Sequence, residues 1–255
     1  MESGTQLESA LHGSTRAVAH VSARALVVLP TYNEIDNLEP MLEQILQLGL
    51  DVLVVDDASP DGTGDLADKL RLQRDGRVDV LHRQCKQGLG TAYVAGFKRA
   101  LQSGYDYILE MDCDFSHDPR YLPMFLERMQ SADLVLGSRY APGGGTVNWN
   151  IFRRFISRSG SLYSQIVLGL PYRDLTGGFK CFRREVLEAI HFETVHSNGY
   201  AFQIELTYRA HQKGFRIEEL PIVFYERRVG SSKMSRDIVL EGMLRVWQFR
   251  FGRGE

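Results

Sequence analysis

The sequence predicts an α/β protein whose core is a Rossmann-like, doubly wound, mostly parallel sheet with helices on both faces. Two observations support this prediction. Short apolar runs, among them Ala25–Pro30 and Asp51–Asp56, have the composition of strands that are covered on both faces. Segments in which apolar residues recur at helical spacing alternate with these runs, as parallel strands joined by crossover helices require.

The elements expected in the first half follow this alternation. After the strand Ala25–Pro30, apolar residues from Leu38 to Leu48 recur near helical spacing, and Gly49 is placed to end that helix. The next strands expected are Asp51–Asp56, Val78–His82, Tyr107–Asp112 and Asp133–Ser138. The helices expected between them are Asp61–Arg74, Gly90–Leu101 and Pro119–Gln130, the last of which is opened by its proline.

The alternation stops after Ser138. The stretch Arg139–Trp149 contains Pro142-Gly143-Gly144-Gly145 and is expected to be a flexible loop. Beyond it we expect the helices Phe152–Leu168, Ala201–Lys213 and Asp237–Phe251, and the strands Gly178–Phe182 and Arg216–Tyr225. We therefore divide the chain into a mobile N-terminal tail, residues 1–22, an α/β domain, residues 23–236, and a C-terminal amphipathic helix, residues 237–255.

Composition narrows the class of protein. The chain has 255 residues, of which 44% are apolar and 24% charged, as in an ordinary soluble globular protein. A net charge of −2 gives no overall attraction to nucleic acid, so no nucleic-acid partner is expected. The three cysteines are odd in number and lack CxxC spacing, which favours a reducing compartment over a disulfide framework or a zinc site. No signal peptide or membrane span is predicted.

The charges are distributed unevenly along the chain. Residues Thr31–Asp68 contain ten acidic residues and no Lys or Arg, whereas Tyr225–Arg253 contains seven basic residues and three acidic ones. Solvated helix faces account for part of the acidic stretch. The asymmetry nevertheless predicts that the two ends of the chain meet partners of different character.

Three polar clusters follow predicted strands. They are Pro30-Thr31-Tyr32-Asn33-Glu34, Asp56-Asp57-Ala58-Ser59 and Asp112-Cys113-Asp114. Open α/β sheets bind ligands beyond the carboxyl ends of their strands, so we expect these clusters to meet at one crevice. Side chains two apart in an extended segment share a face, so Asp112 and Asp114 can point together into it while Cys113 points away. A divalent cation would relieve the repulsion between two such carboxylates. For an isolated DxD, a polar strand end running into a turn is the alternative.

Two further features leave alternatives open. The loop Lys86-Gln87-Gly88-Leu89-Gly90 contains GxG, but Tyr93 stands where the third glycine of GxGxxG would be, so it gives little support for a dinucleotide site. Gly88 remains a nucleotide-binding candidate because a small residue lets the backbone approach a ligand; a plain loop-to-helix turn is the alternative. His117 is either a third metal ligand or a local capping residue.

Seven segments together resemble one family. They are VVLPTYNE, VVDDASPDGT, GLGTAYVAGF, MDCDFSHDP, GSRY, DLTGGFKCFRREVL and ERRVGSSKMS, and they span about residues 24–236. In this order they resemble the family 2 inverting glycosyltransferases, most closely the catalytic domains of dolichyl-phosphate (polyprenyl-phosphate) mannosyltransferases. The resemblance implies a metal-dependent enzyme with the GT-A fold, the donor GDP-mannose, the cofactor Mg or Mn, and dolichyl or polyprenyl phosphate as the acceptor.

The resemblance also implies roles for individual residues. Pro30, Tyr32 and Glu34 would contact the nucleotide, and Asp56 its base or ribose. Asp112 and Asp114 would bind the metal and the diphosphate. Arg139 would approach the sugar or the acceptor phosphate, and Arg227 and Lys233 would bind phosphate from a mobile loop. The sequence departs from relatives at Cys113, often Ala, and at Ser116, where some relatives have a Gln metal ligand, which leaves the third protein ligand open.

A lipid phosphate is already an anion near neutral pH, so the implied transfer needs no general base. The metal would neutralise the leaving diphosphate, while Arg139, Arg227 and Lys233 would hold the acceptor. Intact Asp112, Asp114, Arg227 and Lys233 argue against an inactive nucleotide- or lipid-binding subunit. Another donor such as UDP-glucose stays an alternative, whereas a sugar-1-phosphate nucleotidyltransferase is disfavoured because its glycine-rich N-terminal loop is absent.

The predicted C-terminal helix combines aromatic residues and arginines, a composition that suits a membrane interface. Packing on the core or on a partner subunit is the alternative. We therefore expect a cytoplasmic protein that lies peripherally on the cytosolic face of a membrane, the endoplasmic reticulum in a eukaryote or the plasma membrane in a prokaryote. It would bind there directly or through a small membrane-anchoring subunit.

Overall fold

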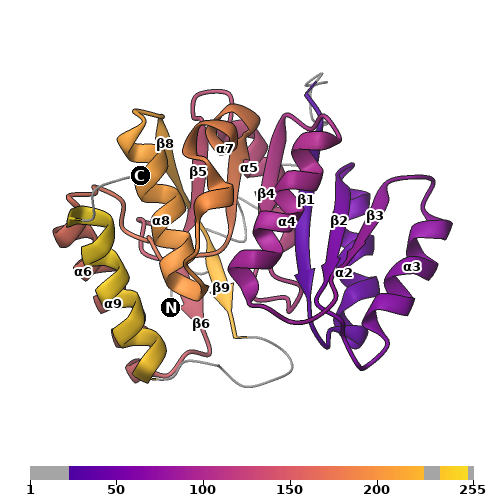
Figure 1. Ribbon diagram of the computed structural model, residues 1–255, viewed down its shortest axis with the longest axis horizontal. Helices are drawn as coiled ribbons and strands as arrows, with labels where there is room; N and C mark the ends of the chain where they lie inside the picture. Colours follow the sequence, from indigo (N-terminus) through magenta and orange to yellow (C-terminus); the bar gives the residue numbers. More distant parts are fainter. Residues whose placement is uncertain (1–22, 227–235, 252–255) are drawn as a thin grey trace.

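The computed structural model describes residues 23–226 and 236–251, with side chains in the second range from Gly242 onward. Its centre is a seven-stranded sheet of order β3-β2-β1-β4-β7-β5-β8 (Figure 1). Every neighbouring pair is parallel except those of β7, which runs antiparallel to both β4 and β5. The strands are β1 (Ala25–Thr31), β2 (Asp51–Asp56), β3 (Val78–His82), β4 (Tyr107–Glu110), β5 (Leu134–Ser138), β7 (Lys180–Arg183) and β8 (Ile217–Pro221). The predicted mostly parallel sheet is confirmed.

Helices cover both faces of the sheet, which is why the central strands β1 and β2 are almost continuously apolar. In β1, Val27 and Leu29 point into one core and Leu26 and Val28 into the other. The first core is closed by α2 (Ile35–Gln47), α3 (Thr63–Gln73) and α5 (Leu122–Arg128). The second is closed by α4 (Leu89–Gln102), α7 (Arg184–Ile190) and α8 (Gly199–Gln212).

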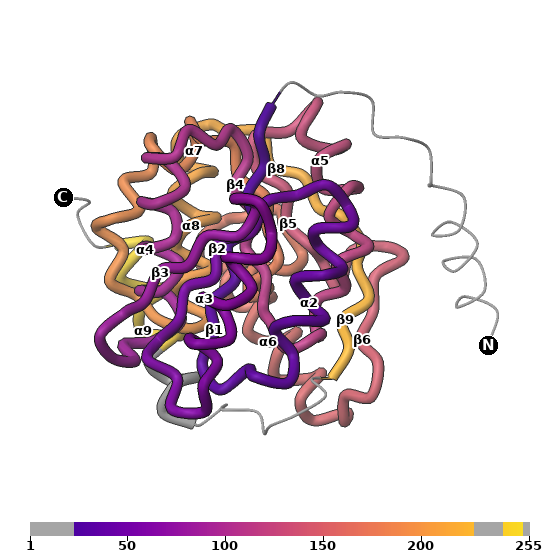
Figure 2. The backbone as a smooth tube through the Cα atoms, turned by 90° about the vertical axis from the view of Figure 1, so that its right-hand side faces the viewer, coloured from indigo at the N-terminus to yellow at the C-terminus, as the bar shows by residue number. Residues whose placement is uncertain are grey.

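Two pairs of elements lie outside these layers. Helices α6 (Ile151–Leu168) and α9 (Arg236–Phe251) pack side by side at one end of the molecule (Figure 1). A small separate core, which includes Leu168, Ile204 and Val246, joins them to α8. The strands β6 (Gly145–Val147) and β9 (Val223–Tyr225) form a second, two-stranded parallel sheet, and they lie side by side in Figure 2.

Several boundaries differ from those expected. Strand β4 ends at Glu110, two residues before the predicted end, so Asp112 lies beyond the strand. The helix expected over Pro119–Gln130 is a 3₁₀ turn, Pro119–Tyr121, followed by α5. In place of the single strand expected over Arg216–Tyr225, the structure has two strands, β8 and β9, which belong to different sheets. Pro221 ends β8 because it has no N–H to donate to a further ladder bond.

Two elements were not expected from the sequence. Strand β6 lies inside the predicted flexible loop, and its partner β9 comes from far along the chain. Helix α7 starts directly after β7 and has only 7 residues, too few for a helical period to stand out. The predicted tail, residues 1–22, and the end of the predicted C-terminal helix, residues 252–255, lie outside the described residues. The predicted domain boundaries therefore stay predictions.

A lysine and a glutamate are buried together in the centre of the sheet. Glu110 and Lys180 face each other in the register of β4 and β7, and both side chains are fully enclosed. Lys180 Nζ donates to Gln203 O at 2.6 Å and to Thr207 Oγ1 at 3.0 Å, which ties the sheet to α8. Burial raises the pKa of Glu110 to about 8 against the attraction of Lys180, and burial lowers the pKa of Lys180 to about 8.

We predict that Lys180→Met lowers the free energy of unfolding by about 3–5 kcal/mol, because it leaves a buried carboxyl without its counter-charge. Without the ammonium, the pKa of Glu110 should rise above its present value. When the pKa of a carboxyl is higher in the folded protein than in the unfolded chain, the folded protein loses stability as the pH rises from the lower pKa to the higher one. The loss should therefore be larger at pH 9 than at pH 6 in denaturant titrations. Lys213→Met, on an exposed residue, is the control, and equal stability of both variants would contradict the prediction.

Candidate active site

The first two polar clusters meet at the carboxyl ends of β1 and β2. Thr31 and Asp56 are register partners, and Thr31 Oγ1 donates to Asp56 Oδ1 at 3.1 Å. Asp56 also accepts from the Ser59 hydroxyl at 2.6 Å and from the Ser59 amide at 3.0 Å. The Asn33 amide donates to Ser59 Oγ at 3.1 Å. These bonds hold the loops after β1 and β2 against each other, as predicted.

The third cluster follows β4, the strand on the other side of β1. The Asp112 carboxylate is partly exposed, with 28% of its side-chain surface accessible, and Tyr93 Oη donates to its Oδ1 at 3.2 Å. The Asp112 amide donates to His117 Nδ1 at 3.1 Å. Asp114 is buried and accepts from the Ser116 amide at 3.0 Å.

Cys113 confirms the predicted alternation. It is 2% exposed and packs in the core on the α2 side of the sheet, away from Tyr93 and α4. Burial raises the pKa of its thiol, and the negative charges of Glu34, Asp114 and Asp112 raise it further. Strands β2, β1 and β4 are parallel neighbours, so the clusters that follow them lie at the same end of the sheet. The three clusters form one acidic site.

The acidic site suits a hard divalent cation that shares its ligands with a phosphate. Within residues 23–226 and 236–251, no three His, Cys, Asp or Glu side chains are grouped so as to hold a metal. Asp112 and Asp114 would supply one or two carboxylates, and Mg²⁺ commonly completes its shell with water and substrate phosphate oxygens. Ser116 Oγ beside them is buried and has no hydrogen-bond partner in the described part of the chain, which also fits a polar ligand here.

Of the two roles considered for His117, the structure favours the local one. Its ring is 2% exposed, stacks on Phe179 with centroids 4.8 Å apart and meets Phe224 edge-on at 5.2 Å. Because Nδ1 accepts the amide proton of Asp112, that nitrogen carries no proton of its own. His117 thus fixes the turn that carries the carboxylates.

Basic residues stand on the loop before α4. Arg83 pairs with Asp57 and donates to Thr91 Oγ1 at 2.7 Å, while burial raises the pKa of Asp57 against the effect of Arg83. Lys86 Nζ lies 3.4 Å from the centre of the Tyr32 ring, so the loop closes over the first cluster. Gly88 has φ 105°, a backbone conformation that favours glycine, and a Cβ there would lie 2.9 Å from Asn198 Oδ1, so the Asn198 side chain would have to move.

Arg139, at the end of β5, makes contacts that were not expected. Its Nε and Nη2 each donate to Asp174 at 2.7 Å, and Nη2 also donates to Thr176 Oγ1 at 2.9 Å. Burial would lower the pKa of Arg139, but Asp174 more than offsets this and raises it. In this structure the guanidinium is committed to Asp174 and holds the loops after β5 and before β7 together.

Asp174 was not singled out from the sequence. It is 1% exposed, and Arg139 holds the pKa of its carboxyl below the usual value despite that burial. The available signal was its place at the start of the segment DLTGGFK, which carries part of the family resemblance. Tyr93 was noted only as a departure from GxGxxG, and its bond to Asp112 could not be predicted.

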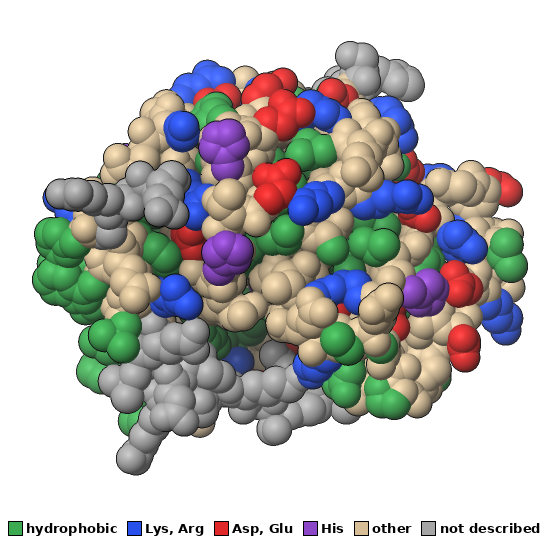
Figure 3. Space-filling view, in the orientation of Figure 1, with side chains coloured by type: hydrophobic (Ala, Val, Ile, Leu, Met, Phe, Trp, Pro, Cys, Tyr) green, Lys and Arg blue, Asp and Glu red, His purple; other side chains and the backbone are tan. Residues whose placement is uncertain are grey.

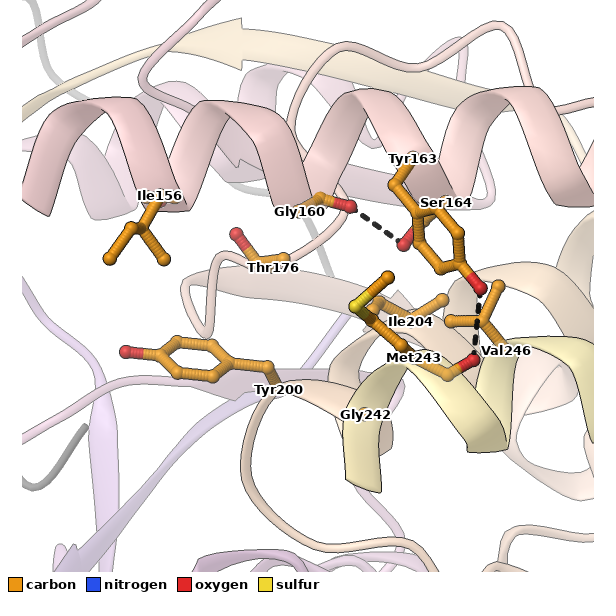
Figure 4. Close-up of a pocket in the computed structure, with 11 residues that line it drawn as sticks. Ile156, Gly160, Tyr163, Ser164, Thr176, Tyr200, Ile204, Gly242, Met243 and Val246 are labelled. Atoms are coloured by element: carbon orange, nitrogen blue, oxygen red, sulfur yellow. Dashed lines mark hydrogen bonds between the residues drawn. The ribbon is translucent and has the colours of Figure 1, made fainter. Parts of the chain in front are cut away.

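Next to Arg139, an apolar pocket opens between α6, α8 and α9 (Figure 4). Ile156 and Tyr163 of α6, Ile204 of α8, and Met243 and Val246 of α9 line it, and Tyr163 Oη donates to Met243 O at 3.1 Å. Thr176, the partner of Arg139, forms part of its wall. The pocket therefore lies beside the Arg139–Asp174 pair, between that pair's partner Thr176 and the α6–α9 helices.

The outer sides of α6 and α9 expose a continuous group of apolar side chains, which we call the α6–α9 face (Figure 3, left). Phe152, Phe155 and Ile166 of α6 are 68–73% exposed, and Leu244, Trp247 and Phe251 of α9 are 49–66% exposed. Helix α9 packs on α6 and α8 through Val246, as the packing alternative predicted. It also exposes aromatic residues, as the composition of this helix suggested. Among the described residues, no helix is long and apolar enough to cross a membrane.

Arg227 and Lys233 lie outside the described residues, so their predicted phosphate contacts stay predictions. The strand that leads toward them ends at the acidic site, because the Tyr225 amide donates to Ser116 O at 3.2 Å. Pro30, Tyr32, Glu34 and Asp56 lie in the first two clusters, and their contact with a nucleotide stays a prediction.

The fold and the acidic site define a sugar-nucleotide-dependent transferase, and comparison with known proteins agrees. Residues 26–191 match the model of Glycosyl transferase family 2, and the chain belongs to this family. It has the GT-A fold. An undecaprenyl-phosphate mannosyltransferase from Micrococcus luteus is 51% identical over 225 residues, 88% of this chain and 92% of the relative. A polyprenol monophosphomannose synthase from Mycolicibacterium smegmatis is 46% identical over 243 residues, 93% of this chain and 92% of the relative.

Solved structures share the fold at low sequence identity. Glucosyl-3-phosphoglycerate synthase from Mycobacterium tuberculosis, in complex with Mn²⁺, UDP and glucosyl-3-phosphoglycerate, superposes with a TM-score of 0.64 at 16% identity, covering 89% of this chain and 80% of that one. A mannosyltransferase from Pyrobaculum calidifontis, in complex with GDP-mannose and Mn²⁺, has a TM-score of 0.56 at 15% identity, covering 90% and 70%.

We predict that Asp112→Asn and Asp114→Asn each reduce sugar transfer below about a tenth of wild type, because both remove charge from the acidic site. Thermal melting should change little. Cys113→Ala is the matched control, since this side chain points into the core, and it should keep nearly full turnover. Steady-state kinetics and melting curves test the set. Turnover above a tenth in both Asp variants would argue against a metal role.

Proposed function

We propose that the chain transfers mannose from GDP-mannose to dolichyl or polyprenyl phosphate with inversion. The observation that carries the proposal is the meeting of the Asp112–Asp114 pair with the acidic ends of β1 and β2, in a chain 46–51% identical to relatives named for polyprenol-phosphate mannose synthesis. An acidic cleft attracts a metal, and the metal makes a place for an anionic diphosphate.

The donor would lie across the carboxyl ends of β1, β2 and β4. We assign the nucleotide to Pro30, Tyr32, Glu34, Asp56 and Gly88, together with Asp112. The carboxylates of this group suit the N–H and O–H donors of a base and a ribose. A divalent cation, Mg or Mn, would be held by Asp112 and Asp114 and would neutralise the diphosphate as it leaves.

The acceptor phosphate is an anion before it reacts, and its oxygen can attack the anomeric carbon without losing a proton. The chain must therefore supply positive charge rather than a base. We assign this task to Arg227 and Lys233, with Arg139 at the edge of the acceptor site. Since Arg139 is bound to Asp174 and Thr176, its part would be to shape the wall that the acceptor approaches.

The lipid part of the acceptor requires a membrane surface. We propose that the α6–α9 face lies on the cytosolic surface of that membrane, with aromatic residues in the interface and the exposed Arg154, Arg158 and Arg250 near anionic head groups. The apolar pocket would then open from the membrane side toward Arg139. A small membrane-anchoring subunit on the same face is compatible with this orientation.

Transfer of labelled mannose from GDP-mannose to a polyprenyl phosphate, with and without Mg²⁺ or Mn²⁺, tests the function directly. We expect a lipid-linked product that requires the cation and forms much faster than with UDP-glucose. Asp114→Asn is the negative control. If UDP-glucose were the better donor, the site would belong to a different sugar transferase. Metal-dependent nucleotide binding without transfer to any lipid phosphate would indicate a binding subunit.

We predict that the double variant Phe155→Ser and Trp247→Ser weakens binding to anionic lipid vesicles by at least about tenfold, because each side chain loses on the order of 1 kcal/mol of apolar burial. Leu72→Ser, on an even more exposed apolar residue of α3, is the control and should not affect binding. Vesicle flotation measures the effect. Equal flotation of both variants would place the membrane contact elsewhere.

A further inference from the structure

Tyr93 reaches the acidic site from the buried side of α4. Its hydroxyl donates to Asp112 Oδ1 at 3.2 Å, while the residue itself is fully buried. The ring is parallel to Phe202 of α8, with centroids 6.2 Å apart, and stacks on Phe97 at 6.0 Å. Aromatic neighbours from two helices thus fix the position of this hydroxyl.

His117 holds the backbone of the same residue. Its Nδ1 accepts from the Asp112 amide at 3.1 Å, and the imidazole is fixed between Phe179 and Phe224. Asp112 is therefore held at two points, its amide and one carboxylate oxygen. The Asp112 carboxylate is also the more exposed of the pair, with 28% of its side-chain surface accessible.

We propose that Tyr93 is a positioning residue for the divalent cation: its hydroxyl fixes the orientation of the Asp112 carboxylate, which would hold the metal. This inference rests on the proposed function, in which Asp112 is a metal ligand. Hydrogen-bond partners behind a ligating carboxylate fix its orientation, and losing one typically weakens metal binding or activity 10- to 100-fold.

The chemistry of Tyr93 suits a permanent donor. A phenol is protonated near neutral pH, so its hydroxyl can donate a hydrogen bond to a carboxylate. The position of this tyrosine in the sequence also bears on the GxGxxG comparison. Tyr93 stands where GxGxxG would place its third glycine, so the same position that excludes a dinucleotide fingerprint supplies the donor.

The test is Tyr93→Phe, which removes the hydroxyl and keeps the ring. We expect Mn²⁺ to bind at least about tenfold more weakly in the presence of GDP, as measured by calorimetry and by the electron paramagnetic resonance signal of free Mn²⁺. Binding of GDP without metal should stay unchanged, and kcat should fall together with Mn²⁺ affinity.

Tyr105→Phe is the matched control. Tyr105 Oη donates to Asp51 Oδ2 at 3.0 Å, a bond of the same kind at the opposite edge of the sheet. This variant should lower the melting temperature without affecting Mn²⁺. If Tyr93→Phe bound Mn²⁺ like wild type and lost only melting temperature, the hydroxyl would be structural and the inference overturned. If wild type bound no Mn²⁺ beside GDP, the proposed metal site would fail along with the inference.

Discussion

Repulsion among carboxylates is the constraint around which the carboxyl end of the sheet is built. Glu34, Asp56, Asp57, Asp112 and Asp114 gather there from three neighbouring strands. Most of these carboxylates accept a hydrogen bond from a neighbouring group. Asp56 accepts from Thr31 and Ser59, Asp57 from Arg83, Asp112 from Tyr93, and Asp114 from the Ser116 amide. Through these local bonds the fold tolerates a concentration of negative charge, which a bound cation would convert into the proposed phosphate site.

The antiparallel strand β7 gives the sheet two parts. On one side, β3, β2, β1 and β4 are parallel and present the acidic site. On the other, β5 and β8 lead into the Arg139–Asp174 pair, the pocket and the α6–α9 face. Lys180 connects the parts, since it faces Glu110 across the β4–β7 register and is bonded to α8. One polar centre thus faces the donor, and one largely apolar end faces the proposed lipid acceptor.

Sequence reasoning succeeded where one local rule acts alone. The bounds of β2 and β3 were predicted as observed, and alternation alone gave the direction of Cys113. It failed where partners come from far along the chain. Strand β6 exists because β9 pairs with it, and Asp174 matters because Arg139, 35 residues earlier, donates to it. The contact of Tyr93 with Asp112 depends on how α4 packs on the sheet, which no local pattern records.

The division at β7 has an evolutionary consequence. The β4–β7 and β5–β7 ladders are backbone bonds, which do not depend on side-chain identity. Mutations that reshape the loops after β5 or the surfaces of α6 and α9 can therefore accumulate without moving the residues at the ends of β1, β2 and β4. A lineage built on this frame can exchange one acceptor for another while its donor chemistry stays intact.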